Sequence, residues 1–273
     1  MSARGPAVGV GVHDGLTARL AEIAGFDLVW VGSLEVSARF GIPDRNLITS
    51  SEMASVISEV RAATNLPIFV DADNGYGSDL TAMRAATFFE AAGAQALVIE
   101  DNAFPKENSL VVGHSRQLVD VSDFVTRLSA IRTARKEMQI VARTEALVAG
   151  LGVEEAVLRL RKYAAAGIDG LFVQVNSGCR DLLFPVLNEL RGVLPFVLAP
   201  TALPEVKVAD YAEYGVSTVL FANIVVRKIV ATLSKALSEL RQTECLSEVE
   251  GPLAPVSEVF KIMDRAAVPF RLH

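Results

Sequence analysis

A repeated junction between a helical segment and a strand is the feature that most restricts how this chain can fold. Four times a helix-like stretch ends at a glycine and an apolar run follows almost at once, in AGFDLVWV, AGAQALVIE, AGIDGLFVQV and YGVSTVLFA. Glycine is favoured where a helix ends in the left-handed conformation. Runs that are apolar throughout are typical of parallel strands covered on both faces. The junctions at Gly25, Gly93, Gly167 and Gly215 therefore predict alternating helices and parallel strands.

Further apolar runs bring the number of predicted strands to eight. Three of them, PIFVDAD (67–73), QIVAR (139–143) and FVLAP (196–200), each follow a segment with helical periodicity, and a first strand fits residues 8–11. Eight βα units favour a closed (β/α)8 barrel of the TIM type, with an open doubly wound sheet as the alternative. The length of 273 residues suits one such domain.

Composition excludes several classes of function. The net charge of −6 and the pI near 5.2 argue against a nucleic-acid partner, because phosphate backbones attract clustered Lys and Arg. The two cysteines, Cys179 and Cys245, lack the spacing of a zinc site or a disulfide framework. Every apolar run is far shorter than the ~20 residues of a membrane span, and the first residues lack a signal-peptide pattern. We therefore expect a soluble cytoplasmic protein with no membrane partner.

The end of the chain differs from the rest. Residues 1–241 accommodate the barrel, whereas residues 242–273 carry Pro252 and Pro255 ahead of the apolar-periodic SEVFKIM. We expect this extension to pack on a partner subunit. The alternative is a helix that caps its own barrel.

Polar residues at the ends of the apolar runs indicate where a site would lie, because active sites of α/β barrels lie at the carboxyl ends of the strands. These residues are Asp71 and Asp73 after the third strand, Glu100 and Asp101 after the fourth, Arg143 after the fifth with Glu145 just beyond, and Gln174 after the sixth.

The acidic residues of this group predict a divalent metal site. Asp71 and Asp73 are two positions apart in what begins as a strand, so we expect their side chains on one face, near Glu100. Hard carboxylate oxygens suit Mg²⁺, with Mn²⁺ as an alternative. The competing interpretation is that the acids cap helices or pair with Arg143, which is common for one Asp and less so for a cluster. Arg143 itself could equally be such a partner or bind a substrate carboxylate or phosphate.

A polar loop follows the fourth strand directly. The segment EDNAFPKENSL (100–110) carries Lys106, Asn108 and Ser109. Long polar loops over a barrel mouth are frequently lids. We expect Lys106 to supply positive charge, and Asn108 and Ser109 to supply hydrogen bonds to a substrate after closure. A solvated connector is the alternative.

Five segments carry a combined pattern: AEIAGFDLVWVGSLEVSARFGIPD, DADNGYG, EDNAFPKENSL, VARTEALVAGLG, and Pro200 with Thr201. Together they span most of residues 8–240 and resemble the phosphoenolpyruvate mutase branch of the isocitrate lyase superfamily. The resemblance implies a barrel with a Mg²⁺ site, a gating loop, and a homo-oligomer, usually a tetramer, that exchanges its last helix between subunits. It also implies interconversion of phosphoenolpyruvate and 3-phosphonopyruvate, a step of phosphonate biosynthesis in which the phosphoryl group moves from the enol oxygen to carbon three.

The resemblance also implies roles for individual residues. Asp71 would ligate the metal, with Asp73, Glu100 and Asp44 around it, largely through water. The substrate carboxylate would bind the backbone N–H groups of Gly32, Ser33 and Leu34. The expected catalytic residues are Asp44, Lys106, Asn108 and Arg143, of which Arg143 would hold the phosphoryl group. The expected substrate-binding residues are Trp30, Gly32, Ser33, Leu34, Ser109 and Gln174.

Two residues and one short segment depart from the family pattern. Asn102 stands where Lys is usual, Gln174 stands where a histidine is expected to touch the phosphoryl group, and VGSL replaces the usual GSGL at the carboxylate anchor. The nearest alternative is phosphonopyruvate hydrolase, which tends to have Thr where this chain has Asn108, so Asn108 favours the mutase. The segment FPKENSL lacks the cysteine of the lyase loop motif. A C–C lyase or hydrolase acting on another 2-oxo or 2-hydroxy diacid, and an inactive binding subunit, remain as alternatives.

Overall fold

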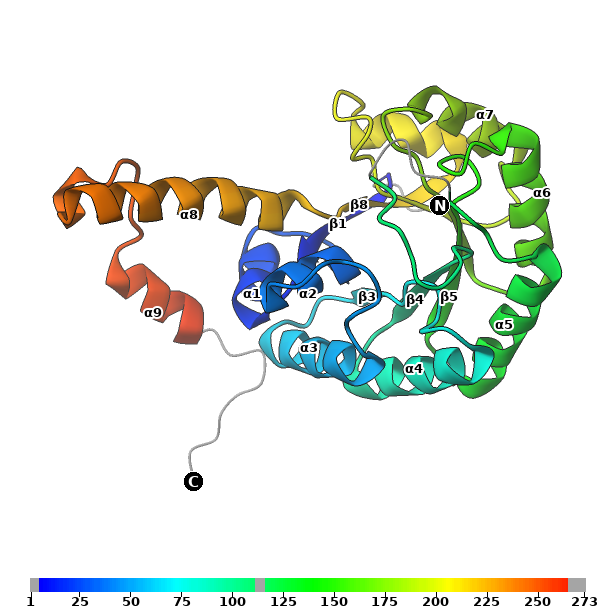
Figure 1. The fold of residues 1–273 in the computed structure, drawn as a ribbon, viewed down its shortest axis with the longest axis horizontal. Coiled ribbons are helices and arrows are strands. Elements are labelled where there is room, and N and C mark those ends of the chain that lie inside the picture. Colours follow the sequence, from blue (N-terminus) through cyan, green and yellow to red (C-terminus); the bar gives the residue numbers. More distant parts are fainter. Residues whose placement is uncertain (1–4, 111–115, 265–273) are drawn as a thin grey trace.

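In the computed structural model, which describes residues 5–110 and 116–264, the eight predicted strands are parallel and close into a barrel (Figure 1). Strands adjacent in the chain pair with each other, and β1 pairs with β8, which excludes the open sheet. The strands are β1 (Ala7–Val12), β2 (Leu28–Val31), β3 (Ile68–Asp71), β4 (Ala96–Glu100), β5 (Gln139–Thr144), β6 (Gly170–Val173), β7 (Phe196–Leu198) and β8 (Val216–Phe221).

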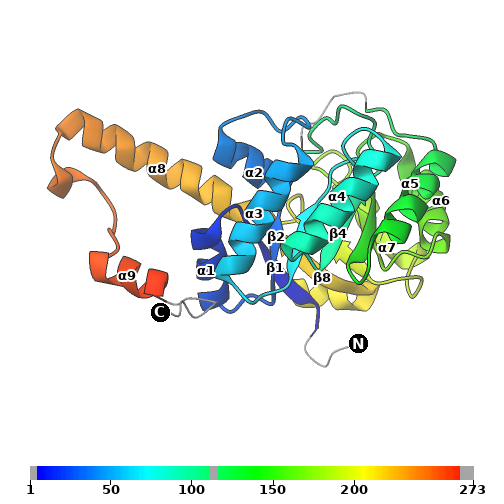
Figure 2. The same cartoon turned by 90° about the horizontal axis from the view of Figure 1, so that it is seen from below.

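Helices lie between the strands and cover the outside of the barrel, as Figures 1 and 2 show. The α-helices are α1 (Gly15–Ile23), α2 (Ser33–Phe40), α3 (Ser50–Ala63), α4 (Asp79–Ala92), α5 (Val121–Ala134), α6 (Gly152–Ala165), α7 (Leu183–Glu189), α8 (Ile224–Thr243) and α9 (Val256–Asp264). Short 3₁₀ segments are η1 (Arg180–Leu182), η2 (Val208–Tyr214) and η3 (Leu246–Glu248). The connection between β7 and β8 is therefore 3₁₀ rather than the α-helix that a regular βα unit would have.

The predicted glycine junctions are confirmed. Gly25, Gly93, Gly167 and Gly215 all have positive φ, between 77° and 105°. Gly93 ends α4 and Gly215 ends η2. A residue with a Cβ is disfavoured in this conformation, so each glycine stops its helix and turns the chain into the next strand.

The interior of the barrel explains which strand-end residues reach the site. An apolar cluster inside the barrel includes Val98 on β4, Val141 on β5 and Phe172 on β6. Side chains two positions apart in a strand share a face. Glu100, Arg143 and Gln174, each two positions further on, therefore continue the inner face at the carboxyl end, with Asp71 in the same relation to Phe69.

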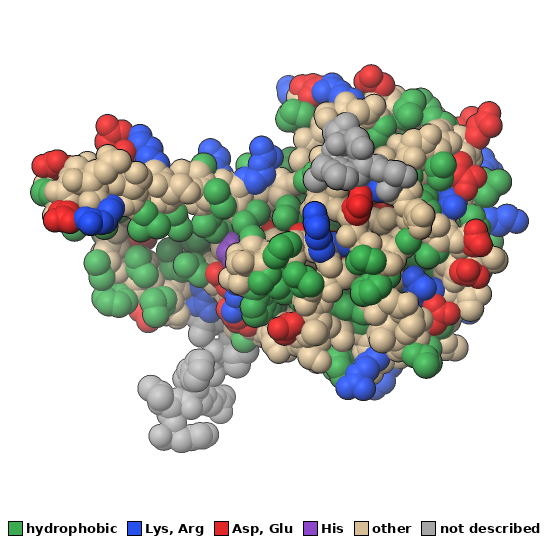
Figure 3. Space-filling view, in the orientation of Figure 1, with side chains coloured by type: hydrophobic (Ala, Val, Ile, Leu, Met, Phe, Trp, Pro, Cys, Tyr) green, Lys and Arg blue, Asp and Glu red, His purple; other side chains and the backbone are tan. Residues whose placement is uncertain are grey.

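Helix α8 extends away from the barrel, and α9 runs back toward α1 (Figures 1 and 2). Neither α8 nor α9 has a buried residue, and hydrophobic side chains are visible along both in Figure 3. The guanidinium of Arg19 on α1 donates hydrogen bonds to the carbonyls of Ile262 and Met263, at 3.1 Å each. The apolar-periodic segment predicted after Pro255 is thus helical and lies beside its own barrel. Among the described residues, no helix has the length and apolar character needed to cross a membrane.

Candidate active site

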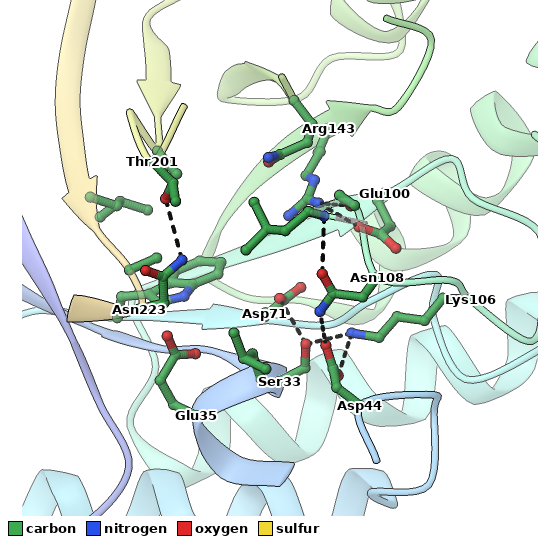
Figure 4. A pocket seen from close by; sticks show the side chains of 18 of the residues that line it. Ser33, Glu35, Asp44, Asp71, Glu100, Lys106, Asn108, Arg143, Thr201 and Asn223 are labelled. Atoms are coloured by element: carbon green, nitrogen blue, oxygen red, sulfur yellow. Dashed lines mark hydrogen bonds and ion pairs between the residues drawn. The ribbon is translucent and has the colours of Figure 1, made fainter. Parts of the chain in front are cut away.

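A cavity opens at the carboxyl ends of the strands, and Figure 4 shows the side chains around it. Apart from Gly32 and Asp73, every predicted site residue lines it. These are Trp30, Ser33, Leu34, Asp44, Asp71, Glu100, Lys106, Asn108, Ser109, Arg143 and Gln174. Gly32 is the residue that precedes α2, and Asp73 lies directly behind Lys106. The structure therefore brings the residues of the predicted site together.

Asp71 and Asp73 meet in a different way from the one expected. Strand β3 ends at Asp71, and Asp73 has a φ of 47°, in the left-handed region. The expectation that both side chains share one face of a strand is therefore wrong. Asp71 Oδ1 accepts a hydrogen bond from the backbone N–H of Asp73 at 3.1 Å, and Asp71 Oδ2 accepts one from the Ser33 hydroxyl at 3.1 Å. The turn after β3 brings the two acids close together.

Lys106 inserts its ammonium group among the acids. Its Nζ lies 2.6 Å from Asp73 Oδ1 and 2.7 Å from Asp44 Oδ1, and it donates to Ser33 Oγ at 2.6 Å. Burial alone would lower the pKa of Lys106, but Asp73, Asp44 and Asp71 together raise it well above its usual value. Burial raises the pKa of Asp73 to about 6, although the neighbouring Lys106 lowers it. Lys106 is therefore charged, and it compensates the cluster of carboxylates.

The loop that carries Lys106 is folded onto the cavity. Asn108 Nδ2 donates to Asp44 Oδ2 at 2.8 Å. The backbone N–H of Lys106 donates to Asn46 Oδ1 at 2.6 Å, and Asn46 Nδ2 donates to Asp73 Oδ2 at 3.0 Å. These contacts do not fit a solvated connector. Asn46 was not among the predicted residues, and the only sequence signal is that Asn tolerates its positive φ of 57°.

Arg143 pairs with acids and also faces the cavity. Its guanidinium contacts Glu100 Oε2 at 3.2 Å, donates from Nε to Glu145 Oε1 at 2.6 Å, and donates to Ser109 Oγ at 2.7 Å. It also lies 5.2 Å from the ring centroid of Phe172. Burial would lower the pKa of Arg143, but Glu145 and Glu100 raise it. Burial raises the pKa of Glu100 well above its usual value against the opposing effect of Arg143.

Asp101 has a structural role, because its carboxylate links the strands to a helix outside the barrel. Its Oδ2 accepts hydrogen bonds from the hydroxyls of Tyr163 and Thr144 at 2.7 Å each, and Arg159 Nη1 lies 3.2 Å from the same atom. Its Oδ1 accepts from the backbone N–H of Glu145 at 2.8 Å. As the neighbour of Glu100 in a strand, Asp101 points to the opposite face. It therefore joins β4, β5 and α6 and is absent from the cavity lining.

The two polar departures from the family pattern both lie at the site. Asn102 Nδ2 donates to the backbone carbonyl of Glu107 at 3.3 Å and lies 3.5 Å from Glu100 Oε1, so it links the end of β4 to the loop. Gln174 lines the cavity and donates from Nε2 to the carbonyl of Val175 at 2.9 Å. An amide at this position offers a hydrogen bond but no positive charge.

Sequence reasoning missed four further polar residues of the cavity, namely Glu35, Glu107, Thr201 and Asn223. Asn223 Nδ2 donates to Thr201 Oγ1 at 3.3 Å. Asn223 stands two positions after β8, so the rule that polar strand-end residues form the site would have found it. Glu35 lies in the first turn of α2 and is only 2% exposed, and burial raises its pKa to about 8. Acids in a first helical turn are ordinarily solvated, so the sequence carries no signal of this burial.

The donor chemistry fits a metal that keeps much of its water. Within residues 5–110 and 116–264, no three His, Cys, Asp or Glu side chains are close enough together to chelate an ion. Asp44, Asp71 and Glu100 nevertheless present carboxylate oxygens around one cavity. Mg²⁺ prefers hard oxygen ligands, and it is usually bound through one or two carboxylates with several waters retained. The residues thus suit a hydrated Mg²⁺ better than an ion enclosed by protein ligands.

Known proteins resemble this chain in both sequence and fold. The sequence model described as phosphoenolpyruvate phosphomutase matches residues 1–241. The structure of phosphoenolpyruvate phosphomutase from Streptomyces platensis subsp. rosaceus superposes with a TM-score of 0.91 at 33% identity, covering 96% of this chain and 92% of that one. Phosphonopyruvate hydrolase of Variovorax sp. strain Pal2 is 32% identical over 253 residues, 92% of this chain and 87% of the relative.

A further solved structure bears on the cavity. Phosphonopyruvate hydrolase in complex with oxalate and Mg²⁺ has a TM-score of 0.87 and 30% identity, covering 95% of this chain and 90% of that one. Relatives at similar identity also include 2-methylisocitrate lyases, so identity alone does not select one activity. The family match extends over the barrel and includes the residues around the cavity. The chain is therefore an enzyme of the phosphoenolpyruvate phosphomutase family, within the isocitrate lyase/phosphoenolpyruvate mutase superfamily.

Proposed function

We propose that the protein is a Mg²⁺-dependent isomerase that interconverts phosphoenolpyruvate and 3-phosphonopyruvate. The observation that carries this proposal is the loop folded over the cavity, in which Asn108 contacts Asp44 and Lys106 contacts Asp73. Asn108 is the residue that favours the mutase over the hydrolase. The family assignment supplies the class of reaction.

In this proposal the acids hold the metal. Asp71 would bind Mg²⁺ directly, with Asp73, Glu100 and Asp44 around it, largely through water, and Mn²⁺ could replace Mg²⁺. When bound, the ion would stabilise negative charge on the enolate oxygen of the substrate. The Ser33 hydroxyl, which donates to Asp71 Oδ2 at 3.1 Å, would orient that carboxylate.

The start of α2 would hold the carboxylate of the substrate. The backbone N–H groups of a first helical turn have no partner within the helix, and here Val36 is the first to bond back, to the Gly32 carbonyl at 3.0 Å. The N–H groups of Ser33 and Leu34, which have no acceptor among the described residues, can therefore bind an anion, with Trp30 beside them in the cavity lining.

Arg143 would hold the phosphoryl group on the other side of the cavity, with Ser109, Asn108 and Gln174 as hydrogen-bond donors. Transfer of a phosphoryl group through a loose transition state needs positioning and charge stabilisation more than a protein nucleophile. Lys106 and Asn108, held by the acids, would keep the loop closed and water away from the phosphoryl group.

A second function, hydrolysis of phosphonopyruvate, has support from the relative in Variovorax. The uncharged Gln174 also stands where the family has a histidine that is expected to contact the phosphoryl group. The loss of that charge favours the hydrolase or a C–C lyase acting on a 2-oxo or 2-hydroxy diacid. The mutase and the hydrolase would share the cavity and differ in whether water reaches the phosphoryl group.

Phosphorus NMR of the protein with phosphonopyruvate and Mg²⁺ tests the proposal. We expect the phosphonate signal to be replaced by that of phosphoenolpyruvate. Release of inorganic phosphate together with pyruvate would contradict the mutase and favour the hydrolase. Asp71→Asn should abolish the reaction, whereas Asp181→Asn, whose side chain is 96% exposed, should leave it unchanged. Unchanged turnover in the Asp71 variant would remove Asp71 from the metal site.

We further propose that the enzyme is a cytoplasmic homo-oligomer, a tetramer by family resemblance, in which residues 242–273 pack on a partner subunit. Residues 265–273 of this segment lie outside the described residues. Cys179 and Cys245 are free thiols, which suits a reducing compartment. The exposed helices α8 and α9 are the natural surface for this contact.

A further inference from the structure

Glu35 has a buried carboxyl group that the proposed steps do not use. The residue lies in the first turn of α2 and lines the same cavity as Asp71 and Arg143. Figure 4 shows its side chain across the cavity from Arg143, near Asn223. Glu35 therefore reaches the substrate space from the side where the substrate carboxylate is proposed to bind.

One oxygen of this carboxyl group has no partner in the described part of the chain. Glu35 Oε1 is fully buried and makes no hydrogen bond there. Burying a polar atom without a partner is unfavourable, and native proteins rarely leave one unpaired. Because Glu35 lines the cavity, a molecule bound there can supply the missing partner.

The backbone around the carboxyl group is shaped to make room for it. A Cβ at Gly32 would lie 2.1 Å from Glu35 Oε2 and 2.4 Å from Trp30 Nε1. A Cβ at Gly11 would lie 3.2 Å from Glu35 Oε1 and 1.6 Å from the carbonyl oxygen of Ala222. Two glycines from different segments thus keep this position open. Gly32 belongs to the VGSL sequence, which replaces the usual GSGL of the family. The glycine at this position leaves the space that the carboxyl group of Glu35 occupies.

Burial is the main reason why Glu35 is neutral. It raises the pKa of the carboxyl group to about 8, with smaller contributions from Asp71 and Asp44 in the same direction, against the opposing effects of its own backbone N–H and of Lys106. At neutral pH the group therefore carries a proton, donates an O–H hydrogen bond, and does not repel an anionic substrate.

We propose that Glu35 is a substrate-contacting residue that donates a hydrogen bond from its carboxyl group to the substrate carboxylate held at the start of α2. The identity of the substrate as a 2-oxo acid or its enol ester rests on the proposed function. Hydrogen bonds to an ionised acceptor are short and stronger than those between neutral groups. Glu35 would therefore make the cavity selective for a carboxylate over an ester or amide at this end of the substrate.

Oxalate, which presents the same carboxylate, tests the proposal by binding alone. Trp30 is the single tryptophan of the chain and lines the cavity, so its fluorescence should report oxalate binding to the Mg²⁺-loaded protein.

Glu35→Met keeps the length of the side chain but cannot donate a hydrogen bond, and we expect its Kd for oxalate to rise about 10- to 100-fold. Glu35→Gln retains a neutral donor and should lose less than about fivefold. Glu154→Ala, exposed in the first turn of α6, is the matched control and should not change the Kd.

The outcomes separate this proposal from the proposed activity. Oxalate binding that depends on Glu35 supports it even if phosphorus NMR shows no phosphoenolpyruvate. Unchanged oxalate affinity in a folded Glu35→Met variant overturns it. Equal loss of affinity for Mg²⁺ alone, measured by calorimetry, also overturns it, because the residue would then serve the metal. Glu35→Ala replaces the Met variant if thermal unfolding shows that the latter does not fold.

Discussion

The ionisation of Glu35 should make the stability of the protein depend on pH. Its pKa is about 8 in the folded protein and near 4.5 in an unfolded chain, with Asp71, Asp44 and Lys106 as its charged neighbours. Between these values the folded state binds more protons than the unfolded state. The free energy of unfolding should therefore fall as the pH rises through this window.

Glu35→Gln should remove this dependence. Relative to the wild type, we expect the variant to gain roughly 3 kcal/mol in free energy of unfolding between pH 5.5 and pH 8.5. Urea unfolding in metal-free buffer measures the difference, with the exposed Glu154→Gln as the control. A stability gap that stays constant with pH would show that Glu35 is ionised throughout.

Single residues also show how far the sequence could predict the site. Asp71, Glu100, Arg143 and Gln174 were predictable because strand ends of a barrel converge on one cavity. The burial of Glu35 was not, because its carboxyl group packs beside Gly11 of β1, which lies far away in the sequence. A local pattern contains no information about such a contact.

At the scale of elements, the loop after β4 is held shut by a few polar contacts. Asn108 Nδ2 donates to Asp44 Oδ2 at 2.8 Å, and Asn108 Oδ1 accepts from the backbone N–H of Leu110 at 3.0 Å. Residue types predicted a lid here. They could not predict that Lys106 is placed among the acids, because the position of the loop depends on Asn46 from another connection.

Asn108→Ala should loosen this loop. Without the tether to Asp44, we expect faster limited proteolysis within residues 101–110 and a fall in kcat of about tenfold or more, since water reaches the site more easily. Leu80→Ala, exposed on α4 and remote from the cavity, should change neither measurement. Proteolysis at the wild-type rate would show that other contacts hold the loop.

At the scale of the whole molecule, the barrel was predictable and the placement of its C-terminal extension was not. The barrel follows from local signals, since each glycine junction specifies one turn of a repeated pattern. The packing of α8 and α9 depends on what covers their apolar side chains. Among the residues that the structure describes, their own barrel leaves most of that surface exposed.

The apolar stripe of α8 therefore leads to a prediction about assembly. Val230, Leu233, Leu237 and Leu240 recur at helical spacing and are all exposed, and hydrophobic side chains of α9 lie nearby (Figure 3). Exposed apolar surface of this extent is typical of a protein interface, and family resemblance indicates a second copy of this chain as the partner. Light scattering coupled to gel filtration should give a mass above that of the 29.2 kDa monomer.

Placing charges in the stripe tests this assembly directly. The double variant Leu233→Glu, Leu237→Glu puts two carboxylates where a partner would bury leucines, so we expect it to elute as a monomer. Lys228→Glu, also exposed on α8 but outside the stripe, makes a comparable charge change and should leave the mass unaltered. If the wild type is already monomeric, or if the double variant keeps the full mass, the stripe does not form the interface. A monomeric double variant that still binds oxalate and Mg²⁺ would show that each barrel carries a complete cavity and that the stripe of α8 serves assembly.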